Sequence, residues 1–347
     1  MKTAAYWELY AGAGVIAAGI SFLLTPAVRF AAAKLGLYDT PSSALKTHKT
    51  ATPALGGVAL YCAFAATLVF LRFATSFPTG TLRSLRGLLI GGTLVFLLGL
   101  VDDLKKPRGL GFKTKFAVQT AAAAVLLAFG FRIHFIKPDY VAEALTLVWI
   151  VGITNAFNII DIMDGLSASQ AAISALAFLF ISLQRNEFYV NFASASLAGA
   201  AAGFLPWNFS AKRKIFMGDC GSLLAGFLLS AVSLGTHYSK VNNLGVYAPL
   251  IILLVPMYDT LFVMALRIKK GLSPFLGSND HFALRLERMG YSRRQIVAMA
   301  AGAAAVLGVC AFLATALSEI WALCLYLMLA AEILLLSRAL ARVAMRE

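Results

Sequence analysis

The chain has 347 residues, of which 60% are hydrophobic and only 13% are charged, and its mean hydropathy is +0.80. Soluble globular proteins are about 25% charged, so this composition excludes a water-soluble globule and predicts a protein with many membrane spans. The net charge of +14 would suggest a nucleic-acid partner in a soluble protein. In a membrane protein it is typical of cytoplasmic loops beside anionic headgroups, and no long basic tract indicates nucleic-acid binding.

Apolar stretches of spanning length recur along the whole chain. A helix needs about 20 apolar residues to cross the hydrocarbon core of a bilayer. Eleven stretches of roughly this length can be drawn, at 7–28, 54–72, 86–101, 116–133, 142–160, 168–184, 192–209, 222–238, 246–266, 295–316 and 320–338. Because little chain remains between them, we expect an all-α polytopic membrane protein in which residues 1–347 form a single integral membrane domain.

The basic residues are distributed unevenly over the two sides of these spans. An odd number of spans puts the two termini on opposite sides. With the N-terminus outside, 22 of the 30 lysines and arginines fall in inner loops, among them 105–115, 212–214 and 267–294. Cytoplasmic loops are enriched in Lys and Arg. The sequence therefore predicts a protein of the cell's inner (cytoplasmic) membrane with its C-terminus in the cytoplasm.

The same frame puts eight of the nine aspartates in inner loops or at the inner ends of spans. One of them, Asp259, we expect to be structural and paired with a basic neighbour. Asp102 and Asp103 are adjacent and end the third span. Neighbouring carboxylates repel each other, so proteins keep them where a cation or a proton compensates. A span end with a positive loop explains the lysines that follow but not the two acids, so the pair indicates a functional site at the cytoplasmic face.

A run of four polar residues ends the fifth span. Asn155, Asn158, Asp161 and Asp164 recur every three residues, which on a continuous helix gives a ribbon of oxygens winding to the cytoplasmic edge. Polar groups in an apolar span are costly unless something binds them. Amide pairing between helices would explain one asparagine. It would not explain all four residues, so the run predicts a binding site.

A glycine-flanked aspartate precedes the eighth span. Asp219 lies between Gly218 and Gly221, with Ser222 as the expected N-cap of the following helix. Glycines let the backbone approach a ligand closely, and free N–H groups at a helix N-terminus attract phosphate. An aspartate beside phosphate indicates a bridging cation, for which oxygen ligands favour magnesium or manganese. A tight turn in which Asp219 caps the helix is the alternative.

Two polar loops on the same side carry candidate contacts for an anionic substrate. The longest contains His281 and Arg285, and the early loop contains His48 and Lys49. Basic side chains suit phosphate groups. Solvated loops of a positive-inside protein have the same composition, so the residues alone leave both explanations open.

Together these segments resemble the polyprenyl-phosphate N-acetylhexosamine-1-phosphate transferase superfamily, glycosyltransferase family 4. Its bacterial members load N-acetylglucosamine phosphate, or phospho-N-acetylmuramoyl-pentapeptide, onto undecaprenyl phosphate. The resemblance covers nearly the whole chain and rests on four motifs in order on one predicted face. They are the early stretch 48–57, the pair Asp102 and Asp103, the N-x-x-N-x-x-D-x-x-D-G-L run 155–166 and the G-D-x-G-S run 218–222.

The resemblance implies an enzyme that moves a sugar 1-phosphate from a UDP-N-acetylhexosamine to a polyprenyl phosphate and releases UMP. The expected sugar is N-acetylglucosamine or a related N-acetylhexosamine, and the reaction is the first membrane step of cell-envelope glycan synthesis. Asp219 is similar to the metal ligand of the family, and Asp161 to its substrate-site aspartate and a second candidate ligand. The implied cofactor is Mg²⁺, with Mn²⁺ as the alternative.

Roles for the other candidate residues follow from the same comparison of motifs. Lys49 and Lys115 are similar to phosphate-binding lysines of the family, and Asp102 or Asp103 would act as a general base. Asp161 would be catalytic as well. The further expected substrate contacts are Asn155, Asn158, Asp164, His48, His281 and Arg285.

Two departures from the family pattern bear on the donor. The family writes D-G-x-D-G, whereas Ile162 replaces the first glycine. Its H-x-H-H loop motif reads His281, Phe282, Ala283, Leu284, so only the first histidine remains. This difference puts the nucleotide-sugar contacts in doubt and argues against the muramoyl-pentapeptide branch.

Two other activities are open to a chain of this kind. A transporter of an anionic substrate would bind it near the bilayer midplane, at broken helices in paired repeats, but the sequence shows no internal repeat and its acids are peripheral. An aspartate-rich prenyltransferase would need a second aspartate-rich motif of the D-D-x-x-D kind, and Lys106 occupies the fifth position of the only D-D run. A homodimer is among the oligomeric states compatible with the sequence.

Overall fold

The computed structural model describes residues 6–40, 51–106, 108–185, 187–274 and 277–345. These residues form an all-α protein, as the sequence predicts, apart from one two-residue antiparallel ladder in which Tyr38 pairs with Pro53 and Asp39 with Thr52. The elements in this part of the chain are α1 (Trp7–Lys34), β1 (Tyr38–Asp39), β2 (Thr52–Pro53), α2 (Gly56–Ala74), α3 (Thr81–Leu104), α4 (Phe112–Ala128), α5 (Asp139–Ile159), α6 (Leu166–Leu183), α7 (Phe188–Asn208), α8 (Asp219–Ser233), the 3₁₀ helix η1 (Asn243–Tyr247), α9 (Ala248–Ile252), α10 (Leu254–Lys269), α11 (Phe282–Arg288), α12 (Arg293–Ala316) and α13 (Glu319–Ala341).

Each of the eleven apolar stretches coincides with a helix or, at 246–266, with a broken one. Within the described residues, eight helices are long and apolar enough to cross a membrane. A ninth span arises if η1 and α9 are joined with α10, from which they are bent by 73°. The other two stretches lie on α4, of 17 residues, and α8, of 15 residues. The chain is therefore a multi-pass membrane protein, and the count of eleven crossings stays a prediction.

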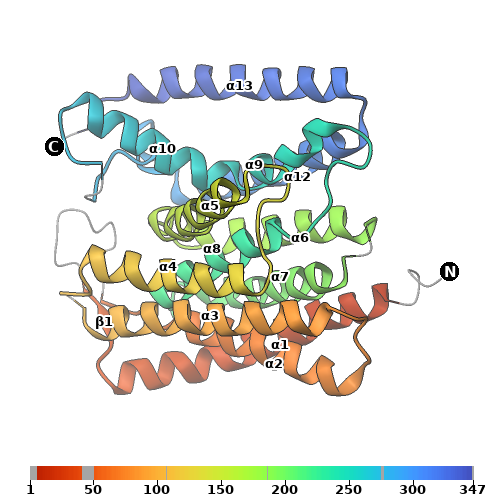
Figure 1. The fold of residues 1–347 in the computed structure, drawn as a ribbon. Coiled ribbons are helices and arrows are strands. Elements are labelled where there is room, and N and C mark those ends of the chain that lie inside the picture. The colour runs from red at the N-terminus through yellow and green to blue at the C-terminus, as the bar shows by residue number, and fades with distance from the viewer. Residues whose placement is uncertain (1–5, 41–50, 107, 186, 275–276, 346–347) are drawn as a thin grey trace.

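The helices run largely side by side, so that the chain passes back and forth between two ends of the molecule (Figure 1). α1 begins at the right-hand end of the view and α13 finishes at the left-hand end, as expected for an odd number of crossings. α6, α7 and α8 are the most buried helices, and α13 lies at the edge, with most of its side chains exposed.

Small residues let the central helices approach one another closely. A Cβ on Gly199 of α7 would lie 2.0 Å from the carbonyl oxygen of Gly14 on α1. A Cβ on Gly99 of α3 would lie 2.5 Å from the backbone of Cys220 on α8. Helices in membranes associate through such backbone contacts because lipid offers no hydrophobic driving force between them. The packing of α3 against α8 brings two of the predicted motifs together.

Candidate functional site

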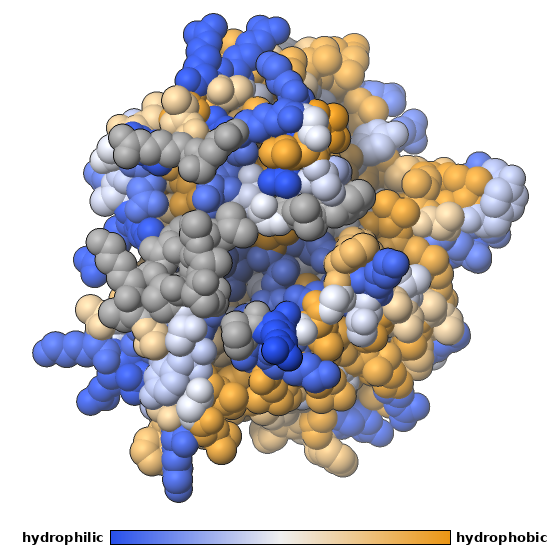
Figure 2. All heavy atoms as spheres, turned by 90° about the vertical axis from the view of Figure 1, so that its left-hand side faces the viewer, coloured by the Kyte–Doolittle hydropathy of each residue, from blue (hydrophilic) through white to orange (hydrophobic). Residues whose placement is uncertain are grey.

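A polar cavity of about 400 Å³ opens at the end of the bundle where the predicted inner loops lie. Figure 2, which faces the left-hand side of Figure 1, shows a recess with hydrophilic residues at this end. Its walls come from segments far apart in the chain: Asp39, Thr52, Ala54, Lys106, Asn158, Asp161, Ile162, Met163, Asp164, Asn208, Lys214, Phe216, Met217, Gly218, Asp219, Glu287 and Arg293.

Asp161 and Asp164 reach the cavity from a turn and not from a helix. α5 ends at Ile159, and residues 160–165 form the connection to α6, so the expected helical ribbon of four polar groups covers only its first half. Gly165 adopts a left-handed conformation with φ of 80°, which glycine alone adopts at little cost. Its N–H donates to Asn208 Oδ1 at 2.5 Å. This contact with α7 holds the turn.

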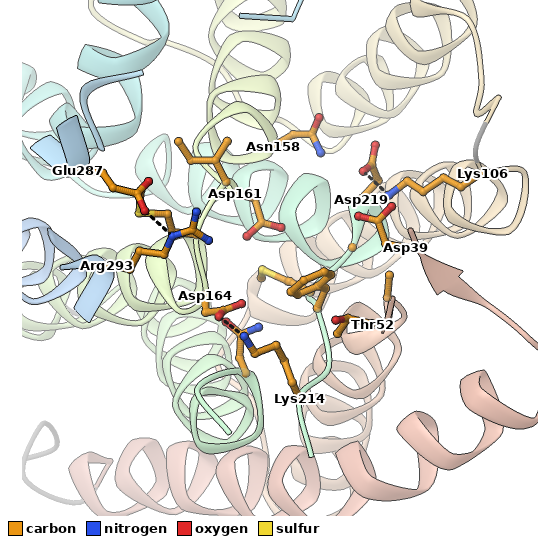
Figure 3. Close-up of a pocket in the computed structure, with 17 residues that line it drawn as sticks. Asp39, Thr52, Lys106, Asn158, Asp161, Asp164, Lys214, Asp219, Glu287 and Arg293 are labelled. Carbon is orange, nitrogen blue, oxygen red and sulfur yellow. Dashed lines mark hydrogen bonds and ion pairs between the residues drawn. The ribbon is translucent and has the colours of Figure 1, made fainter. Parts of the chain in front are cut away.

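The carboxylate of Asp161 points into the middle of the cavity (Figure 3). Its side chain makes no hydrogen bond or ion pair with another residue of the described chain. Burial, with repulsion from Asp219 as the next cause, raises the pKa of Asp161 to about 8. A partly buried acid without a partner is costly unless a ligand compensates it, so Asp161 marks the position where a cation or a donor group would bind.

Asp219 lines the same cavity and is held by two lysines. Lys115 Nζ lies 2.7 Å from Asp219 Oδ2, and Lys106 Nζ lies 3.2 Å from Asp219 Oδ1. Burial lowers the pKa of Lys106, but the carboxylates of Asp219 and Asp103 more than offset this, and the pKa lies above its ordinary value. Lys106 therefore stays charged at the cavity wall, where a basic side chain suits an anionic group.

The adjacent acids Asp102 and Asp103 lie behind Asp219 and do not line the cavity. Asp103 accepts the backbone N–H groups of Asp219 and Cys220 at 3.0 and 2.9 Å, and pairs with Lys106 at 2.7 Å. Asp102 accepts from Leu110 N at 2.6 Å and pairs with Lys115 at 2.8 Å. Both carboxylates are thus engaged in holding the site together, and their role as a base stays a prediction.

The N-terminus of α8 corrects one expectation. α8 begins at Asp219, with Gly218 and not Ser222 at the N-cap. Its first two N–H groups bond to Asp103, and those of Gly221 and Ser222 donate to the carbonyl of Gly218 at 3.1 and 3.0 Å. No N–H of this first turn is left to bind phosphate, because Asp103 already supplies the anion that a helix N-terminus attracts.

The two asparagines of the fifth span have different surroundings. Asn158 lines the cavity and donates to Ser222 Oγ at 3.0 Å. Asn155 instead donates to Gln119 Oε1 at 2.6 Å and lies outside the cavity lining. Asn155 therefore forms an amide contact between two helices, which is the alternative that explains one asparagine of this run.

Asp164 forms an ion pair across the cavity mouth. Its Oδ2 lies 2.5 Å from Lys214 Nζ, and Lys214 in turn accepts a hydrogen bond at its carbonyl from Arg29 Nε of α1 at 3.1 Å. Figure 3 shows this pair on the side of the cavity away from Asn158.

Comparisons with known proteins place these motifs in a family. The family model of glycosyl transferase family 4 matches residues 85–237, which run from the first turns of α3 to just past the end of α8. A Bacillus subtilis protein described as a probable undecaprenyl-phosphate N-acetylglucosaminyl 1-phosphate transferase is 32% identical over 79% of the chain and 76% of its own length. The chain belongs to glycosyl transferase family 4.

Two further relatives cover a similar share of the chain. A Mycobacterium tuberculosis decaprenyl-phosphate N-acetylglucosaminephosphotransferase is 32% identical over 82% of this chain and 77% of its own. The undecaprenyl-phosphate alpha-N-acetylglucosaminyl 1-phosphate transferase of Escherichia coli is 27% identical over 82% of this chain and 78% of its own.

In this member of the family, His281 and Arg285 are buried beside the cavity and not in its lining. His281 Nδ1 lies 2.7 Å from Oδ2 of the fully buried Asp259, whose other oxygen accepts Phe282 N at 2.9 Å. Asp259 is thus structural with a basic neighbour, as expected.

Arg285 ties the end of the chain to this loop. Its guanidinium bonds to Asp280 Oδ1 at 2.5 Å and donates to the carbonyls of Leu340 and Val343 at 2.9 and 2.7 Å. These bonds fix α11 and the end of α13, and a contact of Arg285 with substrate remains a prediction that this geometry does not favour.

Several cavity residues were not predicted as site residues. They are Asp39 and Thr52 of the β1–β2 ladder, Lys106, Asn208, Lys214, Glu287 and Arg293. Lys106 and Lys214 were visible only as positive-inside charge, and no local motif distinguishes the others. His48 and Lys49 lie outside the residues that the structure describes.

The donor atoms at the cavity fit a hard divalent cation. Among the described residues, no three His, Cys, Asp or Glu side chains are clustered closely enough to enclose a metal ion. Mg²⁺ does not need such a cage, because it is usually bound by one or two carboxylates together with substrate phosphates and water. Asp161, without a partner, and Asp219 provide two carboxylates at one cavity, so the residues present suit Mg²⁺ once a phosphate substrate is bound.

Proposed function

We propose that this protein transfers N-acetylglucosamine 1-phosphate, or a related N-acetylhexosamine 1-phosphate, from a UDP-sugar to a polyprenyl phosphate, with release of UMP. The relatives named above carry N-acetylglucosamine 1-phosphate transferase activity on undecaprenyl or decaprenyl phosphate in their names. The product would be the polyprenyl-diphosphate sugar that begins a cell-envelope glycan.

The observation that carries this proposal is the cavity in which an unpartnered carboxylate, Asp161, lies near an acid held by two lysines, Asp219. Phosphoryl transfer depends mostly on positioning and charge neutralisation. Acids for a cation and lysines for phosphates within one polar recess meet that requirement. A transporter would instead need its binding groups near the bilayer midplane, whereas this cavity opens at the end of the bundle (Figure 2).

Asp161 and Asp219 would hold the Mg²⁺, and a bound Mg²⁺ would neutralise charge on the donor diphosphate. Lys106 and Lys115 lie against Asp219 and would stabilise the negative charge that develops on the phosphate oxygens. Lys214, paired with Asp164, is a further cation of the cavity lining, whereas Lys115 contacts Asp219 from outside that lining.

In the proposed reaction, an oxygen of the acceptor phosphate attacks the β-phosphorus of the donor. The new bond joins this oxygen to the β-phosphorus, and the bond from the β-phosphorus to the bridging oxygen breaks, so that UMP leaves with the electron pair. A phosphate monoester has a second pKa of about 6 and is mostly ionised at pH 7, so it needs little help from a base. This agrees with the engagement of Asp102 and Asp103 in other contacts.

The position of the cavity suits substrates from two phases. We propose that it faces the cytoplasm, because 22 of the 30 basic residues lie in loops on that side of the predicted topology. The lipid tail of the acceptor would then lie against the spans in the inner membrane, and the water-soluble donor would enter the recess from the cytoplasm.

A donor screen tests the proposal. The purified protein in lipid nanodiscs is given a polyprenyl phosphate, Mg²⁺ and one of several radiolabelled UDP-N-acetylhexosamines, and both UMP and labelled lipid are measured. We expect UMP and lipid-linked label in equal amounts with UDP-N-acetylglucosamine or a close relative, and neither after chelation of the metal. If no donor yields UMP, or if label crosses a vesicle membrane without UMP release, the proposal is wrong.

A further inference from the structure

The four residues at the positions of the family's H-x-H-H motif do not line the cavity in this chain. At the positions of its last two histidines stand Ala283 and Leu284, which are buried in a small apolar cluster with Phe262 and Ile296. His281 and Arg285 are engaged with Asp259 and Asp280. The contacts that this loop would make with a substrate must therefore come from other residues.

Two such residues are present on the same part of the chain. Among the described residues after Asp219, only Glu287 and Arg293 line the cavity. Glu287 lies in the last turn of α11, and Arg293 is the first residue of α12, where Ser292 caps the helix with a capping box. The capping box fixes the backbone of Arg293, and the buried bonds of Arg285 fix α11, so both side chains project from anchored elements.

The pair stands across the cavity from the other charged groups. Arg293 Nε donates to Glu287 Oε1 at 2.8 Å. In Figure 3 this pair lies on the opposite side of Asp161 from Asp219 and Lys106. The cavity thus has cations on two walls with the unpartnered carboxylate of Asp161 between them, an arrangement that suits a ligand with separated phosphate and polar groups.

The pair contributes little to the stability of the fold. The side chains of Arg293 and Glu287 are 39% and 37% exposed, and ion pairs with such exposure rarely stabilise a protein measurably. What the ion pair does is orient the guanidinium, because Glu287 takes up its Nε. A guanidinium is a planar fork of donors that matches two oxygens of one phosphate.

We propose that Arg293 binds a phosphate of the nucleotide-sugar donor and that Glu287 is the positioning residue that orients its guanidinium. The inference deepens the proposed function and rests on it. The donor is favoured over the lipid acceptor because Arg288, Ser292 and Arg294 beside this wall are exposed and polar, although Met289 and Tyr291 between them are exposed as well. A water-soluble nucleotide reaches such a wall directly, whereas a lipid phosphate arrives along apolar helices.

The test compares Arg293→Gln with Arg294→Gln. Both variants remove one positive charge at neighbouring residues of α12, but Arg294 is exposed and does not line the cavity. We expect Arg293→Gln to raise the KM for the UDP-sugar by about tenfold or more, the effect of losing a charge-assisted hydrogen bond. The KM for polyprenyl phosphate should change less than about twofold, and Arg294→Gln should match the wild type.

Binding of UDP, measured by calorimetry without the acceptor, gives a readout that does not depend on turnover. We expect weaker UDP binding in Arg293→Gln, partial recovery in Arg293→Lys, which keeps the charge but loses the fork, and a smaller loss in Glu287→Gln. The thermal unfolding midpoint should be unchanged in all three, because the ion pair is exposed.

The outcomes separate the two proposals. A wild-type protein that releases no UMP with any UDP-sugar overturns the proposed function, and one that also fails to bind UDP overturns the role of Arg293. An active wild type with an unchanged donor KM in Arg293→Gln overturns the inference alone. A rise confined to the KM for polyprenyl phosphate also overturns it and assigns Arg293 to the lipid phosphate.

Discussion

Asp103 accepts the backbone N–H of Asp219 at a distance of 3.0 Å, across 116 positions of the chain. Asp103 lies in the last turn of α3, and Asp219 is the first residue of α8, so this bond joins the two helices at the cavity. Lys106 bonds to both carboxylates, at 2.7 Å to Asp103 and 3.2 Å to Asp219. The acid that resembles a catalytic base thereby fixes the position of the candidate metal ligand.

Asp103→Asn should therefore destabilise the protein. The amide keeps one acceptor oxygen, but its NH₂ group would face a backbone N–H of α8 and leave that donor unsatisfied. An unsatisfied buried donor costs about 1–3 kcal/mol, so the thermal unfolding midpoint should fall. Asp139→Asn, at an exposed acid outside the cavity, is the control. Unchanged stability combined with a large loss of kcat would instead support Asp103 as the base.

Asp161→Asn, in contrast, should lower activity without lowering stability. Its side chain bonds to no other described residue, so the neutral amide removes no contact. We expect UMP release to fall by about 100-fold or more, the effect of losing about 2.7 kcal/mol of transition-state stabilisation, while the unfolding midpoint stays equal or rises. The same control, Asp139→Asn, should be fully active. Near-normal turnover in Asp161→Asn would remove this residue from the site.

Metal binding should be coupled to proton release at Asp161. Because burial and then Asp219 raise the pKa of Asp161 to about 8, the metal-free protein holds this proton at pH 7. Mg²⁺ must displace it, so the apparent affinity should rise with pH, up to about tenfold per unit, and level off above pH 8. A raised carboxyl pKa also means that the metal-free fold loses stability as the pH rises toward 8, because the folded state binds more protons than the unfolded state.

Calorimetry of Mg²⁺ binding in two buffers of different ionisation enthalpy at pH 7 checks this coupling. We expect a difference in the measured heat that corresponds to about one released proton in the wild type, and none in Asp161→Asn. Equal heats in both buffers for the wild type would show that Asp161 is already ionised.

How much of this structure the sequence predicts depends on how far apart the contacting residues lie along the chain. The helices follow from runs of apolar residues, so each of the eleven predicted stretches overlaps a helix or, at 246–266, a broken one. Asp161 and Asp219 follow from acids placed at span ends. The function of Asp103 as a cap for α8 could not be predicted, because no spacing in one segment reveals a partner 116 residues away.

The same limit applies to the residues that sequence reasoning missed or assigned differently. Asn208, the last residue of α7, and Arg293, the first residue of α12, line the cavity, and neither has a local pattern that distinguishes it from a surface polar residue. His281 stands in a family motif, yet here it packs against Asp259. A motif predicts that a residue lies near a site, but the tertiary contacts decide whether its side chain lines the cavity or packs behind it.

His281→Ala should therefore affect folding more than donor binding. The substitution leaves the fully buried carboxylate of Asp259 with the N–H of Phe282 as its remaining bond in the described chain. Leaving a buried hydrogen-bonding group without its partner costs about 1–3 kcal/mol, so the unfolding midpoint should drop clearly. The double variant Asp259→Asn, His281→Ala replaces the buried carboxylate with a neutral amide and should recover part of the lost stability. A rise in the donor KM at unchanged stability would favour a nucleotide contact by His281.

Asn208 should act on the rate through the two segments that it joins. Its Oδ1 accepts from Gly165 N at 2.5 Å and its Nδ2 donates to the carbonyl of Ile215 at 2.8 Å, so one side chain links the turn that carries Asp161 to the loop that leads to Asp219. Displacing catalytic groups by about 1 Å can cost about 100-fold in rate. We predict that Asn208→Ala lowers kcat at least about tenfold, with little change in either KM.

The conservative variant separates positioning from general stability at this residue. Asn208→Asp keeps the acceptor for Gly165 but loses the donor to Ile215, so it should retain more activity than Asn208→Ala. Steady-state kinetics with saturating donor and acceptor, beside unfolding midpoints for both variants, check this order. A role limited to stability would lower the midpoint and leave the kcat of the folded enzyme unchanged, because the acids would still meet at the cavity.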